Sequence, residues 1–211
     1  MKLTPFLAMF LAALPSVSLF AGGNGTNGHA ATVAAQGTEA QARLFAAARD
    51  GNLTELRAAL AQGAAASERD DRGNTALILA AYYGHAPLVD ALLLAGADPN
   101  AGDGVRGNTA LMGAIFKGDE ATAKRIIDAP GTDVNAKNKA GQTAAMFAAL
   151  FGRSAILDAL SARGADLDAM DAGGYTAENL ALQQGNQALA QRIAELRAGA
   201  APASAETPSA K

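Results

Sequence analysis

The sequence predicts an all-α solenoid of about five helix-turn-helix repeats with short β-turn or hairpin tips, because two series of residues recur in step. Glycines return every 33 or 34 residues, at Gly51, Gly84, Gly118, Gly152 and Gly185. A Gly-x-Thr-Ala segment follows the same period and begins at Gly73, Gly107, Gly141 and Gly174. Self-similarity at this period is typical of repeat proteins in which each unit is one supersecondary structure.

Each repeat is expected to be a turn, two short helices and a loop. The recurring glycines lie where one helix must stop and the chain must turn back, which favours a residue that tolerates positive φ. Apolar residues recur at helical spacing in three consecutive repeats, at Leu88, Val89, Leu92 and Leu93, at Ile126 and Ile127, and at Ile156, Leu157 and Leu160. A single unit cannot bury such a stripe, so stability is expected to come from stacking.

The second repeat resembles an ankyrin repeat, whose pattern runs Gly-x-Thr-Pro-Leu-His-x-Ala-Ala, then Gly-His, Leu-Leu-Leu and Gly-Ala-Asp-x-Asn. The residues that carry the resemblance are Gly73, Thr75, Leu77, Ala80, Ala81, Gly84, His85, Val89, Leu92, Leu93, Gly96, Ala97, Asp98 and Asn100. The resemblance covers about three quarters of the chain. It implies an ankyrin-repeat solenoid that binds another protein through its turn tips and inner helices.

The chain departs from that pattern at two positions of each repeat. The proline is replaced by alanine at Ala76, Ala110, Ala144 and Ala177, and the histidine by Ile78, Met112, Met146 and Asn179. The threonine-to-histidine hydrogen bond usual in the family is therefore absent, and apolar packing is expected to replace it at the first three positions. The first and last repeats are expected to be capping units with wetter outer faces.

The N-terminal residues predict export. Residues 1–21 contain Lys2, an apolar run and the small residues Ser16 and Ser18, which is the pattern of a cleavable signal peptide. The alternative is an uncleaved membrane anchor, but a spanning helix needs about 20 unbroken apolar residues. Pro5 and Pro15 interrupt this segment. We therefore expect a periplasmic or secreted protein with no membrane contact after cleavage.

The remaining chain is expected to divide into three parts. Residues 22–38 are rich in Gly, Asn, Ala and Thr without an apolar period and predict a flexible linker. Residues 39–198 predict the repeat domain, and residues 199–211 a disordered tail. The expected repeats cover approximately residues 40–69, 70–103, 104–137, 138–170 and 171–198.

Composition argues against catalysis, cofactors and metals. The chain has no cysteine and two histidines, and its net charge of −3 contains no long basic block of the kind that nucleic acids bind. His85 occupies the Gly-His position and predicts helix capping or a hydrogen bond between repeats. The acidic residues Asp70, Asp71, Asp166, Asp168 and Asp171 fall on turns, where short side chains bond their own backbone. We expect a non-enzyme without a metal or cofactor.

Aromatic residues mark the candidate binding face. Seven Phe and Tyr lie outside residues 1–21, and four of these occupy the positions just before the mid-repeat glycines. Those positions are Tyr82 and Tyr83, Phe116 and Lys117, and Leu150 and Phe151. The turn tips add Asp71, Arg72, Asn74, Arg106, Asn108, Lys139, Gln142 and Tyr175. An aromatic strip with a polar rim on a concave groove is typical of a specific interface; the alternative is that the rings pack on one another.

The sequence therefore predicts a non-enzymatic protein-binding module that is monomeric alone. Short exported ankyrin proteins, which the chain resembles, include accessory factors of periplasmic oxidative-stress enzymes and neutralisers of toxins. The residues do not choose between these two. A purely structural spacer would predict polar residues instead of Tyr82, Tyr83, Phe116 and Phe151.

Overall fold

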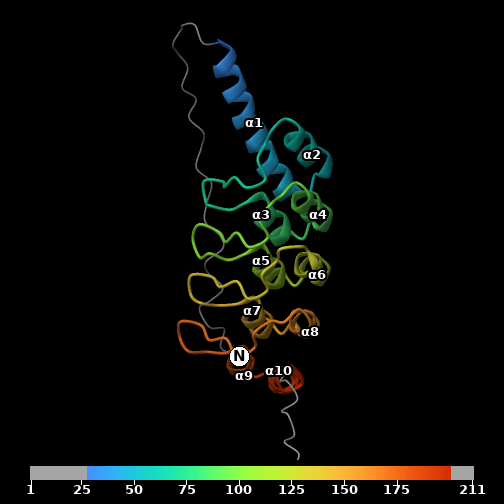
Figure 1. Cartoon of the computed structure of the whole chain (residues 1–211), viewed down its shortest axis with the longest axis vertical. Helices are drawn as coiled ribbons and strands as arrows, with labels where there is room; N and C mark the ends of the chain where they lie inside the picture. Colours follow the sequence, from blue (N-terminus) through green and yellow to red (C-terminus); the bar gives the residue numbers. More distant parts are fainter. Residues whose placement is uncertain (1–27, 201–211) are drawn as a thin grey trace, which may run out of the picture.

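The structure is a computed structural model that describes residues 28–200, and this part of the chain forms five consecutive helix pairs (Figure 1). No strand occurs in it, which confirms the all-α repeat solenoid. The helices are α1 (Gly28–Asp50), α2 (Leu53–Ala61), α3 (Ala76–Tyr83), α4 (Ala86–Leu94), α5 (Ala110–Lys117), α6 (Glu120–Asp128), α7 (Ala144–Leu150), α8 (Ser154–Ala162), α9 (Ala177–Gln183) and α10 (Gln187–Ala200).

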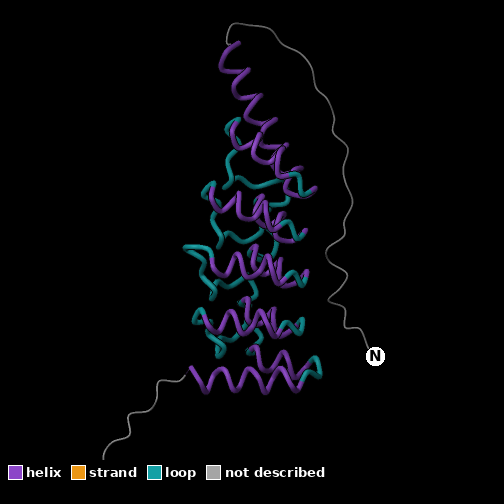
Figure 2. Tube along the Cα trace, turned by 90° about the vertical axis from the view of Figure 1, so that its right-hand side faces the viewer, coloured by secondary structure: helices purple, strands orange, loops and turns teal. Residues whose placement is uncertain are grey.

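The helices stack in two parallel columns. The odd-numbered helices contact one another in sequence from α1 to α9 and form the inner column. The even-numbered helices, from α2 to α10, form the outer column in the same way. Hairpin tips project from the inner column on the side away from the outer helices (Figure 1). Figure 2 shows the helix pairs as successive layers, so each repeat packs only on its neighbours.

Threonine begins four of the five inner helices, and glycine ends two of them. The hydroxyls of Thr75, Thr109, Thr143 and Thr176 each accept a hydrogen bond from the backbone N–H three residues later. Gly84 and Gly118 cap α3 and α5 in the left-handed region, with φ of 79° and 80°. A side chain there would clash with its own carbonyl, which explains the periodic glycine.

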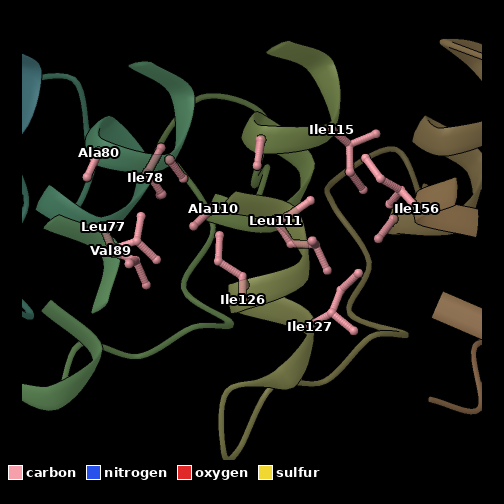
Figure 3. Close-up of a cluster of buried hydrophobic side chains, with 14 of the residues drawn as sticks. Leu77, Ile78, Ala80, Val89, Ala110, Leu111, Ile115, Ile126, Ile127 and Ile156 are labelled. Carbon is pink, nitrogen blue, oxygen red and sulfur yellow. The ribbon is translucent and has the colours of Figure 1, made fainter. Parts of the chain in front are cut away.

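The core lies between the two columns and runs through all five repeats. Leu77, Val89, Leu111 and Ile156 are among the buried residues that Figure 3 shows interlocking between successive layers. Each such side chain contributes about 1.5–3 kcal/mol when fully buried. Alanines at the helix contacts, such as Ala80, are fully buried and allow neighbouring helices to approach closely.

Backbone hydrogen bonds connect the tips of successive repeats. The N–H of Gly104 donates to the carbonyl of Gly73 at 3.0 Å, and the N–H of Lys139 donates to the carbonyl of Arg106 at 2.9 Å. The last tip repeats this bond from Ala172, to the carbonyl of Ala140 at 2.9 Å. The tips therefore form one connected edge along the stack.

Two asparagines make equivalent bridges on the loops between repeats. Asn100 donates through Nδ2 to the carbonyl of Gly131 and accepts from the N–H of Asp133, both at 2.8 Å. Asn135 repeats the bridge to the carbonyl of Gly164 and the N–H of Asp166. These bonds satisfy loop backbone groups that helices cannot reach.

The replaced histidine positions behave largely as the sequence predicts. Ile78, Met112 and Met146 are buried, so apolar packing takes the place of the missing imidazole. Asn179 is exposed instead, and its side-chain oxygen accepts from the N–H of Thr176 at 3.1 Å. Together with the reverse bond to the Thr176 hydroxyl this forms a reciprocal cap on α9.

Two predicted boundaries differ from the structure. Residues 28–38, expected to be linker, form the beginning of α1, and this end of the helix extends beyond α2 (Figure 1). Alanine favours helix more than any other residue, and this propensity outweighs the missing apolar period. Residues 199 and 200, expected in the tail, complete α10. The signal peptide prediction, residues 22–27 and residues 201–211 lie outside the described part.

Candidate protein-binding face

Four of the predicted aromatic residues and Phe147 form one continuous line of contacting rings, here called the aromatic row: Tyr83, Tyr82, Phe116, Phe151 and Phe147. Tyr82 stacks on Phe116 with ring centroids 6.0 Å apart and planes 11° from parallel. Phe116 meets Phe151 edge to face at 5.2 Å, and Tyr83 meets Tyr82 edge to face at the same distance. The row therefore crosses three inner helices, α3, α5 and α7.

Ring-on-ring packing leaves the row partly exposed. Tyr83 is 45 % exposed, while Tyr82, Phe116 and Phe151 are half-buried. Both readings of the sequence thus hold in part: the rings pack on one another, and they still present an apolar surface. Aromatic pairs in such offset and edge-to-face geometries gain about 0.5–1.5 kcal/mol beyond the area they bury.

Sequence reasoning missed one member of the row. Phe147 lies one helical turn before Phe151 on α7, and the two ring centroids are 6.1 Å apart. The signal was available, because residues four apart on a helix share a face. At the other end of the row, the His85 ring stacks on Tyr83 with ring centroids 6.3 Å apart.

His85 performs the structural role that its position predicts. Its Nε2 donates to the carbonyl oxygen of Arg49 at 2.9 Å and so caps the end of α1. Gly51 lies directly against the imidazole, because a Cβ built on Gly51 would come within 2.7 Å of it. The bond connects the first repeat to the second.

The structure does not place all predicted tip residues on an open rim. Asn108 is buried, and its Oδ1 accepts a hydrogen bond from Asn138 Nδ2 at 2.8 Å. The prediction that Asn108 contacts a partner is therefore wrong. Its burial follows from the preceding loop of Gly102 to Val105, which Asp103 folds inward by accepting the N–H groups of four successive residues.

The other predicted tip residues differ in how far solvent reaches them. Lys139 is exposed, but its ammonium donates to the carbonyls of Gly104 and Val105. Tyr175 is exposed at the last tip and lies outside the aromatic row. Of all the residues predicted to contact a partner, the exposed ones are Asp71, Arg72, Tyr83, Lys117, Lys139 and Tyr175. The half-buried ones are Asn74, Tyr82, Arg106, Phe116, Gln142, Leu150 and Phe151.

Two titratable groups of this face have shifted pKa values. Burial alone would raise the pKa of Asp70, but hydrogen bonds from Asn74, Arg49 and Arg72 outweigh it and hold that pKa below its ordinary value of 3.8. Burial raises the pKa of Tyr82, and the neighbouring Tyr83 adds to the effect. The Tyr82 hydroxyl is therefore neutral at physiological pH.

The described residues contain no group of three or more His, Asp or Glu side chains arranged to hold a metal ion. Three of the five predicted turn acids bond backbone: Asp70 accepts from the N–H groups of Arg72 and Asn74, Asp171 from those of Gly173 and Tyr175, and Asp166 from that of Asp168. The other two do not, since Asp71 makes no hydrogen bond in the described range and Asp168 pairs with Arg197 Nη2 at 2.6 Å. Between residues 28 and 200, no helix combines the length and apolar character that crossing a bilayer requires.

Stacked helix pairs with connected tips and an aromatic inner face define the chain as a helical repeat protein. A family model described as ankyrin repeats (3 copies) matches residues 16–103, 44–138 and 111–202, which together include every described helix. The chain belongs to the ankyrin repeat family. Ankyrin repeats mediate protein–protein interaction and are generally not enzymes.

Curated relatives share the repeats and extend well beyond them. The chain is 37 % identical over 109 residues to ankyrin repeat domain-containing protein 63 of Homo sapiens, which covers 50 % of this chain and 28 % of the relative. It is 43 % identical over 72 residues to ankyrin repeat and SAM domain-containing protein 6 of Mus musculus, covering 34 % and 8 %. It is 30 % identical over 113 residues to the mouse inactive serine/threonine-protein kinase TEX14, covering 54 % and 8 %. The chain thus spans less than a third of each relative.

Proposed function

We propose that this protein captures a partner protein through the aromatic row and the adjoining hairpin tips. The observation that carries the proposal is the continuity of the row across three repeats. Half-exposed rings that are held against one another lose little side-chain entropy when a partner covers them, which is the property that makes tyrosine and phenylalanine effective interface residues. A spacer gains nothing from such a surface.

Removing the centre of the row is expected to abolish capture. The double variant Tyr83→Ala/Phe116→Ala takes away the most exposed ring and the ring that contacts both α3 and α7 neighbours. Truncating a central aromatic residue costs about 2 kcal/mol or more in binding. Affinity capture of partners from an extract of the producing cell, read by mass spectrometry, is expected to lose its specific partner.

A matched control separates this loss from general apolar stickiness. Leu94 is 90 % exposed at the end of α4, in the outer column, so Leu94→Ala removes an apolar side chain away from the row. Leu94→Ala is expected to retain the partner, and circular dichroism is expected to show unchanged helix content in both variants. Retention of the same partner by the folded double variant would refute the proposal.

We further propose that the protein works in the periplasm or outside the cell. The support is the charged start, apolar run and small-residue end of residues 1–21. The absence of cysteine is compatible with an oxidising compartment, where unpaired thiols would be oxidised.

Expression of the full chain in a Gram-negative host is expected to give a periplasmic product that begins after the small residues near positions 18–23. Mass spectrometry of the periplasmic fraction measures the new N-terminus directly. Replacing Leu7 and Leu11 by arginine breaks the apolar run and is expected to retain the uncleaved chain in the cytoplasm. A wild-type product that keeps residues 1–21 in the cytoplasmic fraction would contradict export.

A further inference from the structure

Tyr83 lies at the end of the aromatic row, where Tyr82 is its neighbour. Phe116 in the middle of the row is held on both sides, since Tyr82 stacks on it and Phe151 meets it edge to face. Tyr83 meets Tyr82 edge to face at 5.2 Å and is the most exposed ring of the row. A ring with one neighbour in the row keeps more freedom to change rotamer than a ring held on both sides.

His85 gives Tyr83 a second support from outside the row. The imidazole stacks on the Tyr83 ring with centroids 6.3 Å apart and planes 19° from parallel, which is a favourable arrangement for two rings. The two residues flank Gly84, whose φ of 79° ends α3 and turns the chain back. This turn places the imidazole beside the last ring of the helix.

Contacts with the first repeat fix the orientation of the imidazole. Its Nε2 lies 2.9 Å from the carbonyl oxygen of Arg49 and carries the hydrogen, because a carbonyl can only accept. A Cβ on Gly51 would lie 2.7 Å from both Cε1 and Nδ1 of the ring, so a larger residue at position 51 would displace it. His85 makes no side-chain capping bond to α4, which it precedes. The end of the first repeat therefore orients this ring.

The later repeats place a different kind of side chain at the same position. The residue after each later mid-repeat glycine also lies against the glycine of the repeat before, with Asp119 on Gly84, Arg153 on Gly118 and Asn186 on Gly152. These three side chains carry no ring that could stack on an aromatic neighbour. His85 is the ring-bearing member of the series, and it occurs beside the exposed end of the aromatic row.

We propose that His85 is a positioning residue for partner binding, because it holds the Tyr83 ring in the orientation that meets the partner. This inference deepens the proposed function and rests on it. A partner that covers a freely rotating side chain must order that side chain, and the ordering lowers affinity. A Tyr83 ring that is already held by His85 avoids this loss.

His85→Gln and His85→Phe separate the two properties of the imidazole. Glutamine keeps an N–H donor for the Arg49 carbonyl and removes the ring, whereas phenylalanine keeps a ring beside Tyr83 and removes the donor. The probe is a peptide selected on the purified full chain from a random phage library and weakened by Tyr83→Ala. His85→Gln is expected to weaken this peptide about two- to tenfold. His85→Phe is expected to keep the affinity and to lower the urea midpoint of unfolding instead.

Fluorine NMR measures the positioning of the ring without any peptide. The chain has three tyrosines, Tyr82, Tyr83 and Tyr175, so fluorotyrosine labelling gives three signals, and Tyr83→Phe assigns the signal of Tyr83. Fluorine relaxation is expected to show a more mobile Tyr83 ring in His85→Gln and an unchanged Tyr175 ring, which is the internal control. In a Tyr83→Ala background, His85→Gln is expected to cause no further loss of peptide affinity.

The outcomes distinguish this inference from the proposed function. Full peptide affinity and unchanged Tyr83 relaxation in His85→Gln would overturn the positioning role and leave the proposed function standing. Equal weakening by His85→Gln and His85→Phe would overturn it as well, because the retained ring would then have no effect. If every selected peptide binds the Tyr83→Ala/Phe116→Ala variant undiminished, the proposed function fails and this inference fails with it.

Discussion

Gly73→Ala is expected to lower the free energy of unfolding by about 2–5 kcal/mol, a large part of the stability of a domain of this size. Gly73 has φ of +76°, and a Cβ built on it would lie 2.5 Å from the Cα and 2.7 Å from the backbone N of Gly104. Backbone atoms cannot rotate away as a side chain does. The hydrogen bond from the N–H of Gly104 to the carbonyl of Gly73 must therefore lengthen or break.

Gly174→Ala supplies the matched control at the equivalent position of the last tip. Its φ of +78° is nearly the same, but nothing lies within 4 Å of the added Cβ. Only the left-handed strain remains, which costs about 1–2 kcal/mol. Urea titration followed by circular dichroism measures both variants. Equal losses of unfolding free energy for the two variants would show that the close contact between the first two tips does not contribute to stability.

Asp70→Ala is expected to cost about 2–4 kcal/mol of unfolding free energy at neutral pH. The Asp70 side chain is only 8 % exposed, and its Oδ2 lies 2.9 Å from Arg49 Nη2. Its Oδ1 accepts from the N–H groups of Asn74 at 2.9 Å and Arg72 at 3.0 Å. Alanine leaves these donors without their acceptor and also releases the end of α1 from the first tip.

The cost of Asp70→Ala is expected to depend on pH in a defined direction. Because the folded protein lowers the pKa of Asp70, the stabilisation is complete above the ordinary value of 3.8 and is lost as the pH falls through the lower folded pKa. The difference between wild type and variant therefore shrinks in acid, which thermal melts between pH 7 and pH 3 would measure.

Asp71→Ala is the control for the pH experiment. Asp71 is exposed, and its carboxylate takes part in no ion pair or hydrogen bond in the described range. Its replacement is expected to change stability by less than about 0.5 kcal/mol at any pH. A pH dependence of similar size at Asp71 would place the acid effect in the net charge of the chain instead of in the buried carboxylate.

The sequence predicted the repeat architecture well because its signals are local. A glycine that must adopt positive φ, a threonine that caps a helix and an alanine at a tight helix contact are required by the conformation of a few neighbouring residues. Five copies of the mid-repeat glycine and four of the threonine cap made the period visible. The predicted boundary between linker and first helix was wrong, because the alanine-rich segment occurs once and has no second copy with which to compare it.

The contents of the binding face were predicted less completely. Tyr82, Tyr83, Phe116 and Phe151 were found because each precedes a mid-repeat glycine, and a position in the period can be read from the sequence. Phe147 lies outside that register, and the burial of Asn108 depends on an inserted loop that breaks the period. Contacts between side chains of neighbouring repeats depend on how the repeats stack, which the sequence of a single repeat does not specify.

The amino-acid sequence by itself determined that consecutive helix pairs must stack, since no pair can cover its own apolar stripe. Only the tertiary structure decided which charged side chains meet across repeats, because those partners are far apart in the sequence. The turn position of Asp70 predicted hydrogen bonds to its own backbone, but its ion pair with Arg49 forms only because the fold brings the end of α1 to the first tip.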